Sequence, residues 1–360
     1  MADFSKVMKD NLPGLRGADQ FRPLPNPTFA NPAFDKAKLK VLIVRLSPFR
    51  DVDRSTPHLF LADAVRRAEP RAYVDMFFLP ILRDRRLLAG MVAPLLLGME
   101  SGRTADEFDA VLVSNSYTLE LINLPYLLAN SGVPLEAGKR DAKWPPFILG
   151  GSNAMCSQAV IREDGESFVD AVFFGEGERA VATILGVIRD GRRGDKRKLL
   201  RRAAARVDGL WVAGSGMTAG VVKHVVAVPA GDDLPSAYPL LNGDEAGNAK
   251  LQVAFGCPAF CSFCFEGYDR KPYREIPADD LVKKALELKR EQGCSSLDLY
   301  GFSVSEHTEF VRLLVELNRS FDNVTLKSQR MEAFWDYPQV LQVEVTAEKR
   351  TFTLGIEGIS

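Results

Sequence analysis

The chain has 360 residues, of which 46% are hydrophobic and 26% are charged, so it is long enough for two folded domains. Its 46 basic and 47 acidic residues nearly cancel, which leaves no overall field to attract nucleic acid or an anionic membrane. The N-terminus lacks a long apolar segment, and the most apolar run, residues 87–99, is too short to span a bilayer, so we expect a cytoplasmic protein.

The proline-rich residues 1–37 predict an extended N-terminal arm, and a different pattern begins at residue 38. Short apolar runs alternate there with helical patterns, and we expect strands at residues 41–44, 73–79, 110–114, 147–149 and 171–174. Runs of this length between helices indicate a parallel sheet that is covered on both faces. Residues 38–208 are therefore predicted to form one doubly wound α/β domain.

Small and polar residues follow these predicted strands, in the turns that lead to the helices. Ligands of a doubly wound sheet bind at the carboxyl ends of its strands, and glycines there permit close backbone approach. The candidate rim residues are Ser47, Ser114, Gly150, Gly151, Gly175, Glu176 and Gly177. The alternative is that these residues only form tight strand-to-helix turns, and the sequence leaves both interpretations open.

A basic segment, residues 192–206, follows the predicted domain. It contains no aromatic residue on which a base could stack, so a solvated basic helix is favoured over a nucleic-acid surface. Residues 209–248 contain several glycines and prolines, and they are predicted to form a linker with short strands around residues 221–228.

A second pattern of strands and helices occupies residues 249–360. We expect strands at residues 251–255, 296–300, 324–326 and 352–354, and helices at residues 277–292 and 305–318. His307 is expected to be a solvated residue in the first turn of the second helix. This alternation predicts the opening of a βα barrel, in which chemistry takes place on the loops after the strands.

Cys257, Cys261 and Cys264 follow the first predicted strand of this barrel with the spacing C-x3-C-x2-C. Three thiolates can hold an iron-sulfur cube with one iron left open for a chelating ligand. Structural zinc, which prefers four protein ligands, and a redox dithiol of Cys261 and Cys264 are the alternatives that the spacing leaves open. The isolated Cys156 and Cys294 are expected to be small buried side chains.

The cysteine segment resembles the radical S-adenosylmethionine (SAM) superfamily, in which cysteines at this spacing follow the first barrel strand and an aromatic residue precedes the last one, as Phe263 does here. The resemblance implies a 4Fe-4S cluster whose open iron chelates SAM, an external one-electron reductant, and reductive cleavage of SAM to a 5′-deoxyadenosyl radical. It also implies SAM contacts from Phe263, Gly301, Ser328, Arg330 and Glu357. The Gly-Gly-Glu found after the second strand in many members is represented here by Gly301 alone.

The first domain resembles the flavodoxin-like, cobalamin-binding module that precedes the barrel in one subgroup of this superfamily, through residues 147–151 and 173–178. This resemblance implies cobalamin at the rim residues and methyl transfer to an unknown substrate. The Asp-x-His-x-x-Gly loop, whose His ligates cobalt in many cobalamin proteins, is absent after the first strand, and His58 lies nearby without that context. A non-catalytic iron-sulfur protein for electron transfer or redox sensing is the alternative.

Barrels of this superfamily typically have about six strand-and-helix units, whereas the predicted barrel region, residues 249–360, contains only its first four strands. The strand at residues 352–354 would then be an exposed apolar edge, which can pair with another chain. We therefore expect this form to aggregate or to need a second chain that completes the barrel, and to show little radical activity by itself.

Overall fold

The computed structural model describes residues 14–16, 29–52, 55–90, 94–191, 194–216, 220–241, 246–302, 304–326, 329–346 and 354–355. The chain divides into two compact units. The first comprises Met1–Val225 with Tyr238–Asn242, and the second comprises Val226–Ala237 with Gly243–Ser360. Within the described ranges, no helix is long and apolar enough to cross a membrane.

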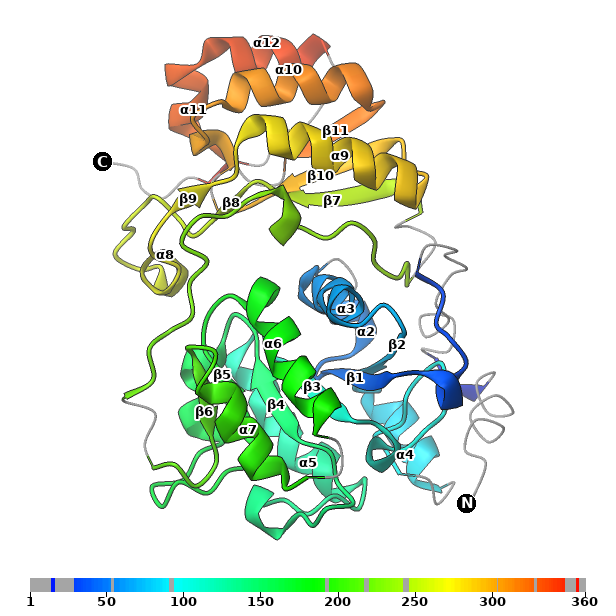
Figure 1. The fold of residues 1–360 in the computed structure, drawn as a ribbon. Helices are drawn as coiled ribbons and strands as arrows, with labels where there is room; N and C mark the ends of the chain where they lie inside the picture. Colours follow the sequence, from blue (N-terminus) through cyan, green and yellow to red (C-terminus); the bar gives the residue numbers. More distant parts are fainter. Residues whose placement is uncertain are drawn as a thin grey trace. The chain divides into compact units, whose positions relative to one another are not determined.

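A six-stranded sheet forms the centre of the first unit, with the strand order β2-β1-β3-β4-β5-β6 (Figure 1). Its strands are β1 (Leu39–Arg45), β2 (Ala72–Phe78), β3 (Ala110–Ser114), β4 (Phe147–Gly150), β5 (Ala171–Phe173) and β6 (Leu210–Val212). Strands β1 to β5 are parallel, and β6 is antiparallel to β5. The order β2-β1-β3-β4-β5 is that of flavodoxin-like sheets, which confirms the predicted fold class.

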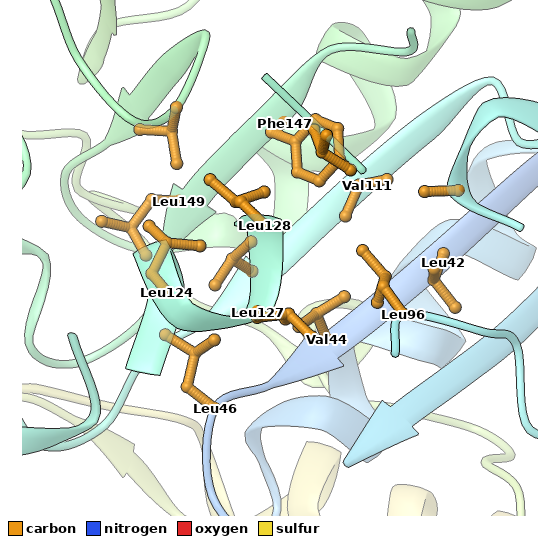
Figure 2. Packing of buried hydrophobic residues seen from close by; sticks show 14 of the residues in the cluster. Leu42, Val44, Leu46, Leu96, Val111, Leu124, Leu127, Leu128, Phe147 and Leu149 are labelled. Carbon is orange, nitrogen blue, oxygen red and sulfur yellow. The ribbon is translucent and has the colours of Figure 1, made fainter. Parts of the chain in front are cut away.

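Helices cover both faces of this sheet. They are α2 (Phe49–Val52), α3 (Pro57–Ala68), α4 (Leu82–Gly90), α5 (Asn123–Ala129), α6 (Gly177–Asp190) and α7 (Lys196–Ala204). Helices α3 and α6 pack side by side on one face. On the other face, Leu124, Leu127 and Leu128 of α5 join one apolar cluster with Val44 and Leu149 of the sheet (Figure 2). Burial on both faces explains why the strands are nearly continuous apolar runs.

The side chain of Asn31 occupies the open edge of β2, the first strand in the sheet order. Its Nδ2 donates to the Val74 carbonyl at 2.9 Å, and its Oδ1 accepts from the Val74 N–H at 2.9 Å. Arg66 of α3 holds this segment, because it donates to Asn31 Oδ1 and to the Ala30 carbonyl at 3.0 Å each. The amide therefore makes the two hydrogen bonds that a neighbouring strand would make at this position.

Part of the span predicted as a linker contributes to the first sheet. Strand β6 lies within residues 209–248 and forms the second edge of the sheet. Around residues 221–228, a single bridge between Gly175 and His224 replaces the expected short strands. His224 donates to the Phe174 carbonyl and accepts from the Glu176 N–H, both at 3.0 Å, so this segment is tied to the loop after β5.

The second unit contains a parallel three-stranded sheet with the order β11-β10-β7. These three strands are β7 (Asn248–Gln252), β10 (Ser296–Tyr300) and β11 (Asn323–Leu326). The unit also contains two two-stranded sheets, one of β8 (Ala254–Phe255) with β9 (Arg274–Glu275) and one of β12 (Gln329–Arg330) with β13 (Leu354–Gly355). Its helices are α8 (Phe265–Asp269), α9 (Ala278–Gln292), α10 (Phe310–Ser320), α11 (Met331–Asp336) and α12 (Pro338–Thr346). Helices α9 and α10 pack on the sheet, as expected for consecutive βα units (Figure 1).

The first predicted strand of this unit is divided in two. Strand β7 pairs with β10 in the parallel sheet, whereas β8 pairs antiparallel with β9. Val253, between β7 and β8, still donates to the Tyr300 carbonyl at 3.1 Å. The cysteines therefore lie in the connection between the two strands of a short β8–β9 ribbon, which extends from the end of β7.

The helix expected from residue 305 begins later, at Phe310, and the prediction for His307 is wrong. His307 is only 3% exposed. Its Nδ1 accepts from the Glu309 N–H at 3.1 Å, which assigns the ring proton to Nε2, 2.9 Å from the Ile276 carbonyl. These hydrogen bonds hold residues 307–309 in a turn that precedes the helix.

Candidate cofactor sites

The cysteine loop lies between β8 and α8 in the second unit. Cys257, Cys261 and Cys264 are half-buried, and each is a free thiol. Cys264 also caps α8, because its Sγ accepts a hydrogen bond from the Gly267 N–H at 3.4 Å. Sulfur ligands of iron-sulfur clusters accept backbone hydrogen bonds of this kind, and these bonds tune the cluster.

The ammonium group of Lys271 fixes the beginning of this loop. Its Nζ donates to the carbonyl oxygens of Cys257 at 2.6 Å, Pro258 at 3.0 Å and Ala259 at 2.9 Å. The same ammonium lies 3.6 Å from the centroid of the Phe260 ring, within the range of a cation–π contact. The start of the loop is therefore held by Lys271, a residue that lies beyond α8.

Among the residues that the structure describes, no group of three or more His, Cys, Asp or Glu side chains has the arrangement of a metal-ion site. The binding of a cluster by the three loop cysteines therefore stays a prediction. Cys294 is 3% exposed, as expected, and burial raises the pKa of its thiol. Cys156 is only half-buried, contrary to expectation; it lies in the short 3-10 helix Ala154–Ala159 after β4, and its Sγ is 3.5 Å from Thr118 Oγ1.

A buried charge lies at the carboxyl end of β1 in the first unit. The Arg45 side chain is 1% exposed and lies 3.5 Å from the Glu120 carboxylate. Its Nη1 donates to Ser114 Oγ at 3.1 Å and to Ser116 Oγ at 3.0 Å. Burial lowers the pKa of Arg45, and the charge of Glu120 opposes this shift. The loops after β1 and β3, which flank the switch point of the sheet, thus share one buried polar network.

Glu120 accepts further hydrogen bonds in this network. Its donors are Ser47 Oγ at 2.6 Å, Asn115 Nδ2 at 2.9 Å, Ser116 N at 2.8 Å and Tyr117 N at 3.2 Å. Ser47 and Ser114, two of the predicted rim residues, are therefore brought together by Arg45 and Glu120. The carboxylate is well supplied with donors, as a buried charge requires.

Gly150 ends β4, and the predicted rim glycines that follow β4 and β5, Gly151 and Gly175, pack against the backbone of the same unit. Asn115 donates its N–H to the Gly150 carbonyl at 2.8 Å. Gly151 has a φ of 108° and a side chain there would collide with the backbone of Asn115. Gly175 has a φ of 118°, and a side chain there would collide with the backbone of His224. At these two positions, tight packing of neighbouring turns accounts for the glycine.

Glu176 and Gly177 form the start of α6. The Glu176 N–H donates a hydrogen bond to the His224 carbonyl, and Gly177 is the first residue of the helix. A methyl group at Gly177 would lie 3.5 Å from Val181 Cγ2, which is ordinary van der Waals contact. Gly177 therefore has room for a side chain, unlike the other two glycines.

Apolar side chains are exposed beside the buried network. On the segments that follow β3 and β4, these side chains and their exposures are Tyr117 59%, Leu119 78%, Ile122 70% and Met155 49%. A hydrogen bond of 3.2 Å from Thr118 Oγ1 to Asn153 Oδ1 joins the two segments. Exposed apolar groups gathered at one edge of a sheet are a feature of ligand and interaction surfaces. His58 is not part of this surface, because it is fully buried against Phe78.

Comparison with known proteins identifies the first unit. Residues 63–213 match the family described as "Radical SAM proteins, N-terminal". The chain is a relative of the radical SAM proteins.

Two tRNA-2-methylthio-N(6)-dimethylallyladenosine synthases are similar over shorter stretches. The one from Fusobacterium nucleatum is 28% identical over 101 residues, which are 26% of this chain and 23% of that protein. The one from Thermodesulfovibrio yellowstonii is 31% identical over 75 residues, or 20% of this chain and 17% of that protein.

Two solved structures of the radical SAM methyltransferase TsrM from Kitasatospora setae share the fold, with a TM-score of 0.52 and 16% sequence identity. One contains the tryptophan substrate and a SAM analogue, and the other contains cobalamin and a [4Fe-4S] cluster. Each match covers 88% of this chain, and it covers 59% and 60% of the two TsrM chains. The chain thus spans well under two thirds of TsrM and less than a quarter of either synthase.

The residues that the radical SAM resemblance assigns to SAM lie at several places in the second unit. Phe263, in the cysteine loop, is 69% exposed, and Gly301 directly follows β10. Arg330, in β12, lies 3.7 Å from Glu306 and 3.4 Å from Glu332. Ser328 and Glu357 lie outside the described residues. The described part of the chain therefore places Phe263 with the cysteines.

Sequence reasoning did not single out Arg45, Glu120 or Lys271. A signal existed for Arg45, because it is a charged residue at the end of an otherwise apolar strand between two covered faces. Glu120 carried a signal as well, because it is the single charged residue between Asp109 and Glu136. Lys271 carried none, since it is one charged residue among several in a polar segment. The roles of Glu120 and Lys271 depend on contacts between loops that the sequence pattern does not specify.

Proposed function

We propose that this protein is a radical SAM enzyme that holds a 4Fe-4S cluster on Cys257, Cys261 and Cys264. The observation that carries the proposal is the cysteine loop itself, which bears three free thiols and whose first residues are held by Lys271 from beyond α8. When bound, the cluster supplies the electron that cleaves SAM into methionine and a 5′-deoxyadenosyl radical. The match of residues 63–213 to radical SAM proteins supports this assignment.

Residues of the second unit would bind and orient SAM. The exposed ring and backbone of Phe263 are available to the adenine, next to the thiols. Gly301 leaves the end of β10 without a side chain, which permits a ligand to approach the backbone there. Arg330, fixed by Glu306 and Glu332, would present its remaining donors to the SAM carboxylate or ribose.

The chemistry of the carboxyl edge of the first sheet suits a cobalamin. A corrin ring is broad and largely apolar on its faces, which suits the exposed Tyr117, Leu119, Ile122 and Met155. Its amide arms suit the accessible polar side chains of Ser116 and Thr118 at the same edge. With cobalamin bound there, methyl transfer from SAM to a carbon of the substrate is the reaction class that we propose.

Anaerobic reconstitution tests the cluster directly. The protein should bind about four irons per chain with broad visible absorbance, as thiolate-ligated cubes do. Replacing Cys257, Cys261 or Cys264 with Ala should abolish iron uptake, whereas Cys156→Ala and Cys294→Ala should leave it intact. Stoichiometric zinc in place of iron would contradict the proposal.

The alternative function is a non-catalytic electron carrier or redox sensor, and SAM distinguishes the two. SAM should alter the electron paramagnetic resonance spectrum of the reduced cluster in an enzyme, because the open iron chelates it, and dithionite should then give 5′-deoxyadenosine. An unchanged spectrum with a full cluster would favour the carrier.

We do not propose RNA as the substrate, although the two synthases act on tRNA by name. The basic helix α7 is in part neutralised by its own unit, because Lys196 lies 3.2 Å from Asp170 and Arg197 lies 3.8 Å from Glu166.

Retention of hydroxocobalamin through gel filtration tests whether the first unit binds cobalamin. Loss of that retention in Leu119→Asp, with the fold unchanged, would locate the site at the exposed apolar edge.

A further inference from the structure

The ammonium of Lys271 is fully engaged by the cysteine loop. An ammonium has three N–H groups, and the three carbonyl oxygens of Cys257, Pro258 and Ala259 lie within 3.0 Å of Nζ. The face of the Phe260 ring, 3.6 Å away, covers the same charge. One side chain therefore binds consecutive peptide groups directly after the first cysteine.

This arrangement orients the opposite side of the peptides as well. The peptide bonds from Pro258 to Phe260 are trans, and a trans peptide directs its C=O and N–H in opposite directions. Because the carbonyls face Lys271, the N–H groups of Ala259 and Phe260 face away from it. Neither N–H donates to a backbone carbonyl within the part of the chain that the structure describes. These two N–H groups can therefore donate hydrogen bonds to the sulfur atoms of a bound cluster, which accept such bonds in iron-sulfur sites.

The backbone around Lys271 is itself packed against the start of the loop. Gly256 has a φ of 78°, and a side chain there would collide with the carbonyls of Arg270 and Pro272. These residues flank Lys271 on both sides, so the segment 270–272 lies directly against the residue that precedes Cys257. The position of the ammonium is thus set by close backbone packing as well as by its hydrogen bonds.

We propose that Lys271 is a positioning residue for the cluster, an inference that rests on the function proposed above. It holds the loop in the shape that accepts the cluster, and it keeps a positive charge beside it. Reduction transfers one electron from the external reductant to the cluster, which makes the cluster one charge more negative. A fixed positive charge nearby favours that product over the oxidised form.

The test compares Lys271→Met, Lys271→Arg and the matched control Lys283→Met, whose lysine is exposed on α9. Each protein is reconstituted anaerobically, and iron content and the midpoint potential are measured by a redox titration followed by electron paramagnetic resonance. Lys271→Met should lose most of its iron, and the cluster that remains should titrate at a more negative potential. Lys283→Met should match the wild type in both measurements.

Lys271→Arg keeps the charge but cannot direct three donors from one nitrogen, so it should retain the wild-type potential with reduced iron content. Wild-type iron content and potential in Lys271→Met would overturn the inference while leaving the cluster assignment intact. If Lys271→Met does not fold, a potential in Lys271→Arg shifted to more negative values would overturn the charge argument. A wild-type protein that takes up no iron would instead refute the proposed function.

Discussion

Arg45 places a charge inside the first unit, at the end of an apolar strand. Its partner Glu120 also accepts hydrogen bonds from Ser47, Asn115 and backbone N–H groups. Removing one member of a buried ion pair costs about 3–5 kcal/mol, because the other charge is left buried and unpaired. The donors that stay around Glu120 reduce this cost, so the lower end of the range applies here.

Arg45→Met should therefore lower the free energy of unfolding by about 3 kcal/mol, measured by urea denaturation. The double variant Arg45→Met/Glu120→Gln should recover part of this loss, because it leaves no unpaired charge. Equal stability of the single variant and the wild type would mean that the pair contributes nothing to folding.

Two rim glycines that look alike in the sequence should respond differently to alanine. Gly151→Ala forces a non-glycine residue to a φ of 108° and brings a Cβ against the Asn115 backbone, so we expect a loss of about 2–4 kcal/mol in unfolding free energy. Gly177→Ala adds a methyl group with room around it at the start of a helix, and it should change stability by no more than about 1 kcal/mol. Similar losses in both variants would contradict this distinction.

At the scale of elements, the strands that are buried on both faces were predictable. The apolar runs that predict β1 to β5 are long enough to identify them without any knowledge of their neighbours. Helix α9 was also predictable, because Pro277 precedes it and Gly293, with a φ of 62°, ends it. Strand β6, the β8–β9 ribbon and the delayed start of α10 were missed. Each depends on hydrogen bonds to residues distant in the sequence, and local pattern carries no signal for them.

His307 connects two such distant segments, and its removal should be costly. His307→Ala would leave the buried Ile276 carbonyl and the part-buried Glu309 N–H without their partner, so we expect a loss of about 2 kcal/mol in unfolding free energy. Glu316→Ala, on the exposed side of α10, is the control and should change stability by less than about 0.5 kcal/mol. Urea denaturation monitored by circular dichroism measures both, and equal stabilities of the two variants would refute the role of His307.

At the scale of the whole molecule, the predicted cluster ligands all lie in the second unit. Metal binding that accompanies folding adds its free energy to the region that carries the ligands. Hydrogen exchange should therefore slow in β7, β10 and β11 when iron is loaded, whereas β1 and β3 should exchange at the same rate with and without iron. Mass spectrometry of proteolytic peptides resolves the two sets of strands. Equal slowing in both units would show that the cluster stabilises the chain as one body.

The side-chain amide of Asn31 hinders another strand from pairing with the open β2 edge of the first sheet. A parallel sheet grows by adding strands at an open edge, and an edge with free N–H and C=O groups is a template for aggregation. At Val74 both groups are already occupied by Asn31, whose amide is in turn held by Arg66 and Glu100. An incoming strand would have to displace this anchored side chain. A single short side chain thus protects the sheet from templated growth at this point of the β2 edge, without the chain having to supply another strand there.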